Sequence, residues 1–274
     1  MNVYYDLTQS PPTHDFINFL VRIEHARIKA GADNLRIGFI LGERFKSPRD
    51  FFYTPERRKW RVQNLLMPLA RLLPSVVDTF IAESGEQIHS YLNHTEISKP
   101  VLKAPAAALE IVDAYLVDKP TPVSITLRDS AFERDRNSNK RQWAKVADWL
   151  QSQGTTPIVI PDVEAEFAGR KTGIDALHYM PAAFCPEIRL ALYERCQQNL
   201  MTQTGPILIA LYADVPLMAY GLLIPEIQCC EESHLRRFRM SPDDDWGPRK
   251  KLSWAHDYAQ TVIADLEAEC LSVT

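Results

Sequence analysis

Short apolar runs alternate along this chain with amphipathic segments of helical period. Four of the apolar runs predict buried strands, at residues 35–41, 76–81, 122–128 and 157–162. Between them, apolar residues recur every three or four positions, as Phe16, Leu20 and Ile23 do, which predicts helices packed on a sheet. Strands that alternate with helices are typical of parallel sheets covered by helices. We therefore predict an α/β fold of two halves with mostly parallel sheets, divided into residues 1–118 and 119–274.

Capping residues indicate where several of the helices begin. Thr13 and Ser138 are expected N-caps. Thr54 is a third, because it is followed by a proline and then by an acid in the first turn. Later helices are expected from Pro186 to about Met201 and over roughly residues 252–270.

Composition and charge exclude several classes of protein. Of the 274 residues, 46% are hydrophobic and 24% are charged, and the net charge of -4 gives no general attraction to nucleic acid or to an anionic membrane. The long apolar stretch 206–225 contains Asp214 and Pro216 and is explained better by two short buried elements than by a membrane span. The five cysteines lack C-x-x-C spacing, and the N-terminus lacks the regions of a signal peptide, so we expect a cytoplasmic protein with reduced thiols.

Arg128 stands where the chain leaves a predicted strand. Open α/β sheets bind ligands in the crevice outside the carboxyl ends of their strands. A guanidinium there stays charged and offers a planar fork of donors that suits phosphate. We predict that Arg128 binds a phosphate group; a structural arginine paired with Asp129 or Asp162 is the alternative.

The loop after Arg128 is polar and leads into a helix N-terminus, where free backbone N–H groups and the macrodipole favour anions. Its candidate phosphate or sugar ligands are Arg136, Asn137, Ser138 and Asn139. A polar loop in which Ser138 only caps the helix is the alternative.

Further candidate positions follow other predicted strands. Thr204, Gly205 and Pro206 form a glycine turn that opens onto an apolar element, and they are expected to be either a second anion cradle or an ordinary tight turn. Asp162 ends a buried strand, where an acid binds a ribose hydroxyl or caps the following loop. His14 begins the first helix and is a candidate general base at neutral pH.

The motifs of several other sites are missing. The sequence contains no G-x-x-x-x-G-K-[ST] and no G-x-G-x-x-G, which argues against a P-loop NTPase and an ordinary NAD-binding domain. It also has no H-E-x-x-H and no G-x-S-x-G. The acidic run 243–245 is interpreted as a surface turn, so we expect neither a metal nor a cofactor.

These residues together carry a resemblance to a known group of proteins. Its segments are Ile125-Thr-Leu-Arg-Asp-Ser130, Arg136-Asn-Ser-Asn139, Ile158-Val-Ile-Pro-Asp162, Gly205-Pro206 and Leu252-Ser-Trp-Ala-His-Asp257. The chain resembles glycosyltransferase-like proteins of bacterial surface-polysaccharide clusters, most strongly over residues 120–260. The strand with its arginine is also distantly similar to the GDP-fucose site of the α1,6-fucosyltransferases. In the first half the likeness is weaker, and Gly42-Glu-Arg-Phe45 fits loosely.

The resemblance implies the GT-B arrangement of two Rossmann-like halves that face each other across a cleft. It also implies a metal-independent enzyme that moves a sugar from a nucleotide-sugar donor to a glycan or related acceptor. Arg128 would stabilise the leaving diphosphate, the 136–139 loop and Gly205 would line the donor pocket, and the acceptor would enter near His14 or Arg44.

Two alternatives to this function stay open at the level of sequence. One is a non-catalytic protein of the same fold that binds a nucleotide or an anionic sugar. The other is an α/β enzyme of another class that acts on phosphorylated metabolites.

Overall fold

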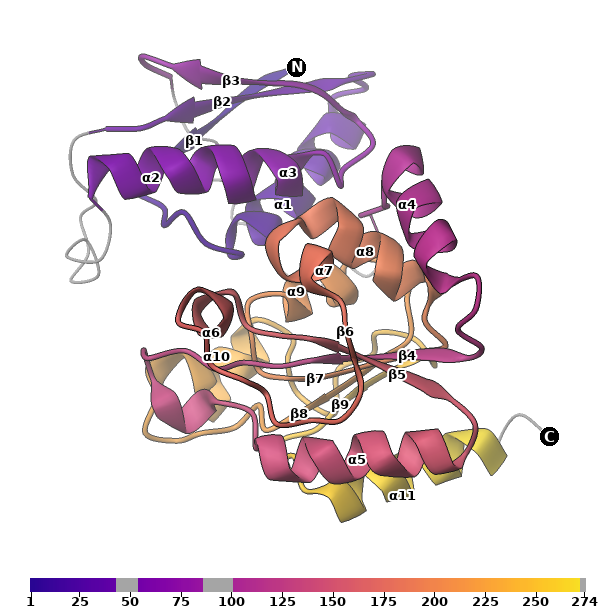
Figure 1. Ribbon diagram of the computed structural model, residues 1–274. Coiled ribbons are helices and arrows are strands. Elements are labelled where there is room, and N and C mark those ends of the chain that lie inside the picture. Colours follow the sequence, from indigo (N-terminus) through magenta and orange to yellow (C-terminus); the bar gives the residue numbers. More distant parts are fainter. Residues whose placement is uncertain (43–53, 86–100, 272–274) are drawn as a thin grey trace.

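The structure of the chain is a computed structural model that describes residues 1–42, 54–85 and 101–271 (Figure 1). It contains two sheets, and every strand pairing in them is parallel. The expected α/β fold with two mostly parallel sheets is therefore confirmed.

The first sheet has three strands and is covered by helices on the side that faces the second sheet (Figure 1). Its strand order is β1 (Asn2–Asp6), β2 (Leu35–Ile40) and β3 (Val76–Ala82). The helices are α1 (Phe16–Lys29), α2 (Pro55–Arg61), a π-helical turn (Val62–Leu66) and α3 (Met67–Ala70). The apolar residues that predicted α1 are buried, as expected.

The second sheet has six strands in the order β6-β5-β4-β7-β8-β9. Their bounds are β4 (Pro122–Thr126), β5 (Thr156–Ile160), β6 (Leu177–His178), β7 (Gln198–Thr202), β8 (Leu217–Tyr220) and β9 (Lys250–Leu252). Numbered along the chain within this sheet, the order is 3-2-1-4-5-6, which is the order of doubly wound nucleotide-binding sheets. The order reverses between β4 and β7, so ligand binding is expected at that point.

Helices cover both faces of the second sheet (Figure 1). On the outer face lie α5 (Lys140–Ser152) and α11 (Ala259–Leu271), with Trp143 of α5 fully buried. Between the two sheets lie α7 (Met180–Phe184), α8 (Pro186–Arg195) and α9 (Ile207–Leu211). The remaining helices are α4 (Ala106–Leu116), α6 (Val163–Phe167), α10 (Glu232–Arg237) and two 3-10 turns (Arg134–Arg136, Gln228–Cys230). Within the described ranges no helix has the length and apolar character needed to cross a membrane.

Two expected helices are wrong in their extent. The helix from Pro186 ends at Arg195, and residues 198–202 form β7. The sequence analysis did not predict β7, because several of its residues are polar. All five residues are nevertheless buried, and the Asn199 amide donates to the carbonyls of Tyr193 (3.0 Å) and Pro216 (2.9 Å). The last helix begins at Ala259 rather than near residue 252, because residues 250–252 pair with β8.

The expected caps are confirmed in one case and wrong in two. The Thr54 hydroxyl accepts a hydrogen bond from the Arg57 N–H (3.3 Å), as predicted. However, α1 begins at Phe16 and α5 begins at Lys140, so neither Thr13 nor Ser138 occupies the N-cap position. The apolar stretch 206–225 forms α9 and β8, which confirms two short buried elements.

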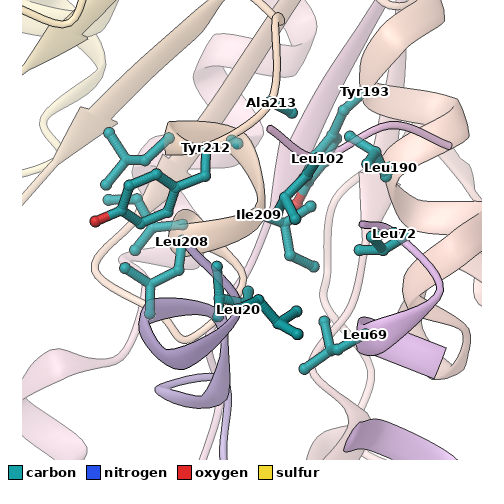
Figure 2. Packing of buried hydrophobic residues seen from close by; sticks show 14 of the residues in the cluster. Leu20, Leu69, Leu72, Leu102, Leu190, Tyr193, Leu208, Ile209, Tyr212 and Ala213 are labelled. Atoms are coloured by element: carbon teal, nitrogen blue, oxygen red, sulfur yellow. The ribbon is translucent and has the colours of Figure 1, made fainter. Parts of the chain in front are cut away.

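A single hydrophobic core joins the two halves. Figure 2 shows Leu20 of α1 and Leu69 of α3 packed toward Leu208 and Ile209 of α9. Leu102 forms a parallel bridge with Ala213 and lies in the same core. Because this core is continuous, the two sheets are held as one body rather than as two freely moving units.

The segment from residue 101 to α4 packs on the second half. The Ala104 N–H donates to the Glu194 carboxylate (2.8 Å), and Asp113 of α4 pairs with Arg195 of α8 (2.6 Å). The same segment also contacts the first half, because the Lys103 N–H donates to the Leu72 carbonyl (2.8 Å). The division at residues 118 and 119 stays a prediction.

Leu69→Ala tests whether the core is shared. Leu69 is fully buried, so its truncation should lower the free energy of unfolding by about 3 kcal/mol through lost burial and a cavity. Urea denaturation followed by circular dichroism should still show one transition. Ile111→Ala, at an exposed apolar position of α4, is the control and should change stability by less than about 0.5 kcal/mol. Separate unfolding of the two halves would contradict the shared core.

Candidate functional site

One cavity, called the main cavity below, has a volume of about 1080 Å³ and is lined by both halves of the molecule. Its lining residues fall within 13–15 and 54–65 of the first half, and within 127–136, 161–167, 183–189, 204–206 and 229 of the second. The segments that follow β4, β5 and β7 all contribute, so the cavity lies at the carboxyl ends of these strands. This is the position at which doubly wound sheets bind their ligands.

Arg128 lies in this cavity as a nearly buried cation. Its side chain follows β4 by two residues and is 6% exposed. The guanidinium donates hydrogen bonds to the carbonyls of Phe132 (2.6 Å) and Glu133 (3.1 Å) and to the Asn137 side-chain oxygen. Burial and then the charge of Arg136 lower the pKa of Arg128. An anion in the cavity would oppose both effects, because its charge stabilises the charged guanidinium.

Arg128 makes no ion pair with any carboxylate in the described residues. Asp129, one of its two possible partners by sequence, pairs instead with Lys140 (2.5 Å) and Arg170 (3.3 Å). Asp162, the other, uses its side chain to cap α6, accepting from the Glu164 N–H (2.8 Å). Neither acid forms an ion pair with Arg128, although the charges of Asp162 and Glu133 raise its pKa against the larger effects of burial and Arg136. Asp162 has the capping role that the sequence left open while still lining the cavity, and phosphate binding by Arg128 stays a prediction.

Only one residue of the 136–139 loop reaches the main cavity. Arg136 lines it and is held by Glu133 (2.6 Å) and by the Gln203 side-chain oxygen (3.1 Å). Asn137, Ser138 and Asn139 are not among the residues that line this cavity, so the structure does not place them as direct ligands there. Instead, the Asn137 amide orients the Arg128 guanidinium.

The N-terminus of α5 is occupied by a carboxylate of the chain itself. Asp257 accepts hydrogen bonds from the Asn139 N–H (2.8 Å) and from the Trp143 indole N–H (2.7 Å). The expectation that this helix end receives a phosphate is therefore wrong. Sequence reasoning missed the contact because 118 positions separate Asn139 from Asp257.

Gly205 brings the two halves into close contact at His14. Thr204, Gly205 and Pro206 all line the main cavity, as does His14. A Cβ atom on Gly205 would lie 2.5 Å from Nδ1 of His14, so the absent side chain makes room for the imidazole. Burial, and then the charges of Arg189 and Arg61, lower the pKa of His14 to about 3. The imidazole is thus neutral at pH 7 and is packed against backbone on one side.

Sequence reasoning missed a second buried cation, Arg189 of α8. It lines the main cavity and is 5% exposed. Its guanidinium donates to the Ala183 carbonyl (3.3 Å) and to the Tyr193 hydroxyl (3.3 Å), which lies 2.8 Å from the Thr126 hydroxyl at the end of β4. No carboxylate among the described residues pairs with it. The sequence signal that could have identified Arg189 is an arginine inside the apolar helical run 188–193.

Asp15 is the second residue that the sequence analysis did not select. It stands at the N-cap position of α1, where its carboxylate accepts a hydrogen bond from the Thr13 hydroxyl (2.9 Å). The side chain is exposed and lines the main cavity from the first half, on the wall opposite β4.

Aromatic side chains surround the same cavity and are open to solvent. They are Trp60, Phe132, Phe167 and Phe184, with exposed fractions of 47%, 40%, 71% and 41%. Phe167 and Phe184 contact each other edge to face, with ring centroids 5.3 Å apart. Exposed aromatic groups that line a cavity are suited to stacking on a sugar ring or a base.

Comparison with solved structures shows which known folds resemble this pair of sheets with its cavity. The fold is similar to that of a glycosyl transferase family 9 protein from Veillonella parvula DSM 2008, with a TM-score of 0.53 and 10% identity over 98% of this chain and 89% of the other. It is also similar to the E. coli heptosyltransferase WaaC solved with ADP, with a TM-score of 0.50 and 15% identity over 98% and 99% of the two chains. The fold is GT-B-like. No family model matches the sequence, and no curated protein matches it.

Some expectations are not tested by these findings. The resemblance to the α1,6-fucosyltransferases stays a prediction, and Arg44 and most of the 42–45 segment lie outside the described residues. In the part of the chain that is described, no three His, Cys, Asp or Glu side chains are grouped to hold a metal. Metal independence stays a prediction.

Gly205→Ala tests the contact between the halves. The new methyl group should clash with His14 and lower the free energy of unfolding by about 1–3 kcal/mol. Combining it with His14→Ala should recover most of that loss, because the clash needs both side chains. Chemical denaturation of the two single variants and the double variant measures this coupling, and purely additive effects would contradict the contact.

Proposed function

We propose that this protein is a glycosyltransferase that moves a sugar from a nucleotide-sugar donor to a hydroxyl group of a glycan or related acceptor. The observation that supports it best is the pair of buried guanidinium groups of Arg128 and Arg189, which line a cavity between two Rossmann-like halves without a carboxylate partner in the described residues. Buried charges are normally paired, so an anionic ligand is the expected partner. The GT-B-like fold supports a nucleotide sugar as the source of that anion.

In the proposed site, the donor diphosphate lies against Arg128 with Arg189 and Arg136 nearby. Positive groups placed where negative charge develops stabilise a departing diphosphate. Asp162 lies at the end of β5, where an acid can bind a ribose hydroxyl. The WaaC structure contains ADP, which supports a nucleoside diphosphate as the group that binds here.

Asp15 is the proposed general base, in preference to His14. Sugar transfer passes through a transition state with oxocarbenium character, which a carboxylate stabilises and a neutral imidazole does not. The acceptor hydroxyl oxygen attacks the anomeric carbon while the bond from that carbon to the diphosphate breaks. The electron pair of that bond leaves with the nucleoside diphosphate, and Asp15 takes the hydroxyl proton.

The arginine pair is tested first by binding. Thermal shifts with ADP, GDP, UDP and CDP should identify a nucleotide that stabilises the wild-type protein, since a bound ligand raises stability by mass action. Arg128→Gln should weaken that binding, and it should lower transfer with the matching nucleotide sugar by a factor of about 100, as about 3 kcal/mol of lost charge stabilisation implies. Arg189→Gln should act in the same direction.

Arg36→Gln is the matched control, because Arg36 forms an exposed ion pair with Asp78 and does not line the cavity. A full thermal shift and full turnover in Arg128→Gln would contradict the proposed donor site. Nucleotide binding without release of diphosphate or transfer would instead support the non-catalytic alternative.

Asp15→Asn separates the two candidate bases. Loss of the base should lower kcat by about 100-fold or more while the affinity for the nucleotide stays near that of the wild type. His14→Ala should have a smaller effect on kcat. Asp33→Asn, an exposed carboxylate beyond the end of α1, is the control. Unchanged kcat in Asp15→Asn, with a large loss in His14→Ala, would assign the base to His14.

A further inference from the structure

A second hollow lies on the other side of the contact between His14 and Gly205. Its volume is about 570 Å³, and α1 of the first half and α10 of the second form much of its wall. The two cavities share five lining residues: Asp15, Arg136, Thr204, Gly205 and Cys229. The second hollow is therefore adjacent to the main cavity but has its own set of polar groups.

Arg22 of α1 supplies the strongest of these groups. Its Nε–H is buried and has no hydrogen-bond partner, and Arg22 forms no hydrogen bond or ion pair with the described residues. A buried donor of a charged group that lacks a partner costs stability, and such groups in a native structure usually have a ligand or another reason to persist.

A second guanidinium, that of Arg237 of α10, faces the same hollow from the opposite half. It is exposed and lies over the ring of Phe238 (5.8 Å to the ring centroid), and besides burial, its charge helps to lower the pKa of His234. Arg237 forms no ion pair with a carboxylate of the described residues. The third arginine in the lining, Arg136, already pairs with Glu133. Asp15 is the one acidic residue among the described residues that line the hollow, so Arg22 and Arg237 give it a net positive charge.

We propose that the second hollow is an anion site that binds the phosphate or carboxylate group of a small molecule between Arg22 and Arg237. Guanidinium groups from two sides supply the paired donors that such groups accept. The volume suits a compact ligand of the size of a sugar phosphate. The proposal does not require the transferase function, but a ligand bound there would lie beside Asp15 on the shared wall.

Inorganic phosphate is the probe. To lower the contribution of the main cavity, phosphate is titrated into Arg128→Gln and into the triple variant that adds Arg22→Gln and Arg237→Gln. Binding is followed by calorimetry. The two added changes should weaken the remaining phosphate binding by about tenfold or more. A variant that adds Arg236→Gln instead should bind like Arg128→Gln, because Arg236 is on the same helix but outside both cavities. Equal affinity in the Arg128→Gln and triple variants would overturn the proposal.

Stability without phosphate distinguishes a binding role from a structural one. Because Arg22 has no partner to lose, Arg22→Gln should leave the Tm unchanged or raise it. A lowered Tm, together with unchanged phosphate affinity, would show that Arg22 is structural and would overturn the proposal.

Kinetics with an identified donor and acceptor then distinguish two sources of the anion. If the acceptor carries it, Arg22→Gln and Arg237→Gln should raise the KM of the acceptor and leave the KM of the donor unchanged. If a separate molecule carries it, both KM values should stay unchanged although phosphate binding is lost. Failure of the transferase assay alone leaves the phosphate titration intact as the test of this site.

Discussion

The hydroxyl of Ser138 holds together the two loops on which the main cavity depends. It accepts a hydrogen bond from the Arg128 N–H (2.8 Å) and lies 2.8 Å from the Thr202 hydroxyl at the end of β7. β4 and β7 are neighbours in the sheet, but the chain leaves them toward opposite sides. This buried contact at the point of divergence fixes the start of one loop against the other, and so fixes Arg128 relative to the turn at Gly205.

Neutral groups accept all the hydrogen bonds of the two buried arginines, and the carboxylates of Asp162 and Glu133 act on Arg128 only from beyond ion-pair distance. Arg128 and Arg189 donate to carbonyl, amide and hydroxyl oxygens, all of which are neutral. Such partners replace the hydrogen bonds lost with water, whereas a carboxylate would also neutralise the cation. The protein itself therefore offsets only part of the free energy that is lost when the guanidinium charge is removed from water. In the proposed function, an anionic ligand would supply the remainder, and binding would then be selective for negative charge.

The sequence predicted what depends on local pattern and missed what depends on distant contacts. Arg128 was identified because an apolar strand ends there, and the two parallel sheets followed from alternating strands and helices. β7 was missed because three of its five residues are polar and reveal their strand only through burial between β4 and β8. Asp257 at the head of α5 and Arg189 beside β4 could not be placed, because tertiary packing alone brings them there. The cap expected of Ser138 failed for the same reason.

The continuous core limits how the cleft can select its ligand. Leu20 and Leu69 of the first half and Leu208 of the second are packed together (Figure 2), so opening the cleft would expose apolar surface. A cavity that does not open widely must distinguish ligands by the groups already on its walls. On the β4 side these groups are arginines that donate to neutral oxygens. On the α1 side, Asp15 lies between two hollows, and each contains arginines that form no ion pair with a carboxylate of the described residues. A molecule with one anionic group in each hollow would therefore place the atoms between those groups beside the Asp15 carboxylate.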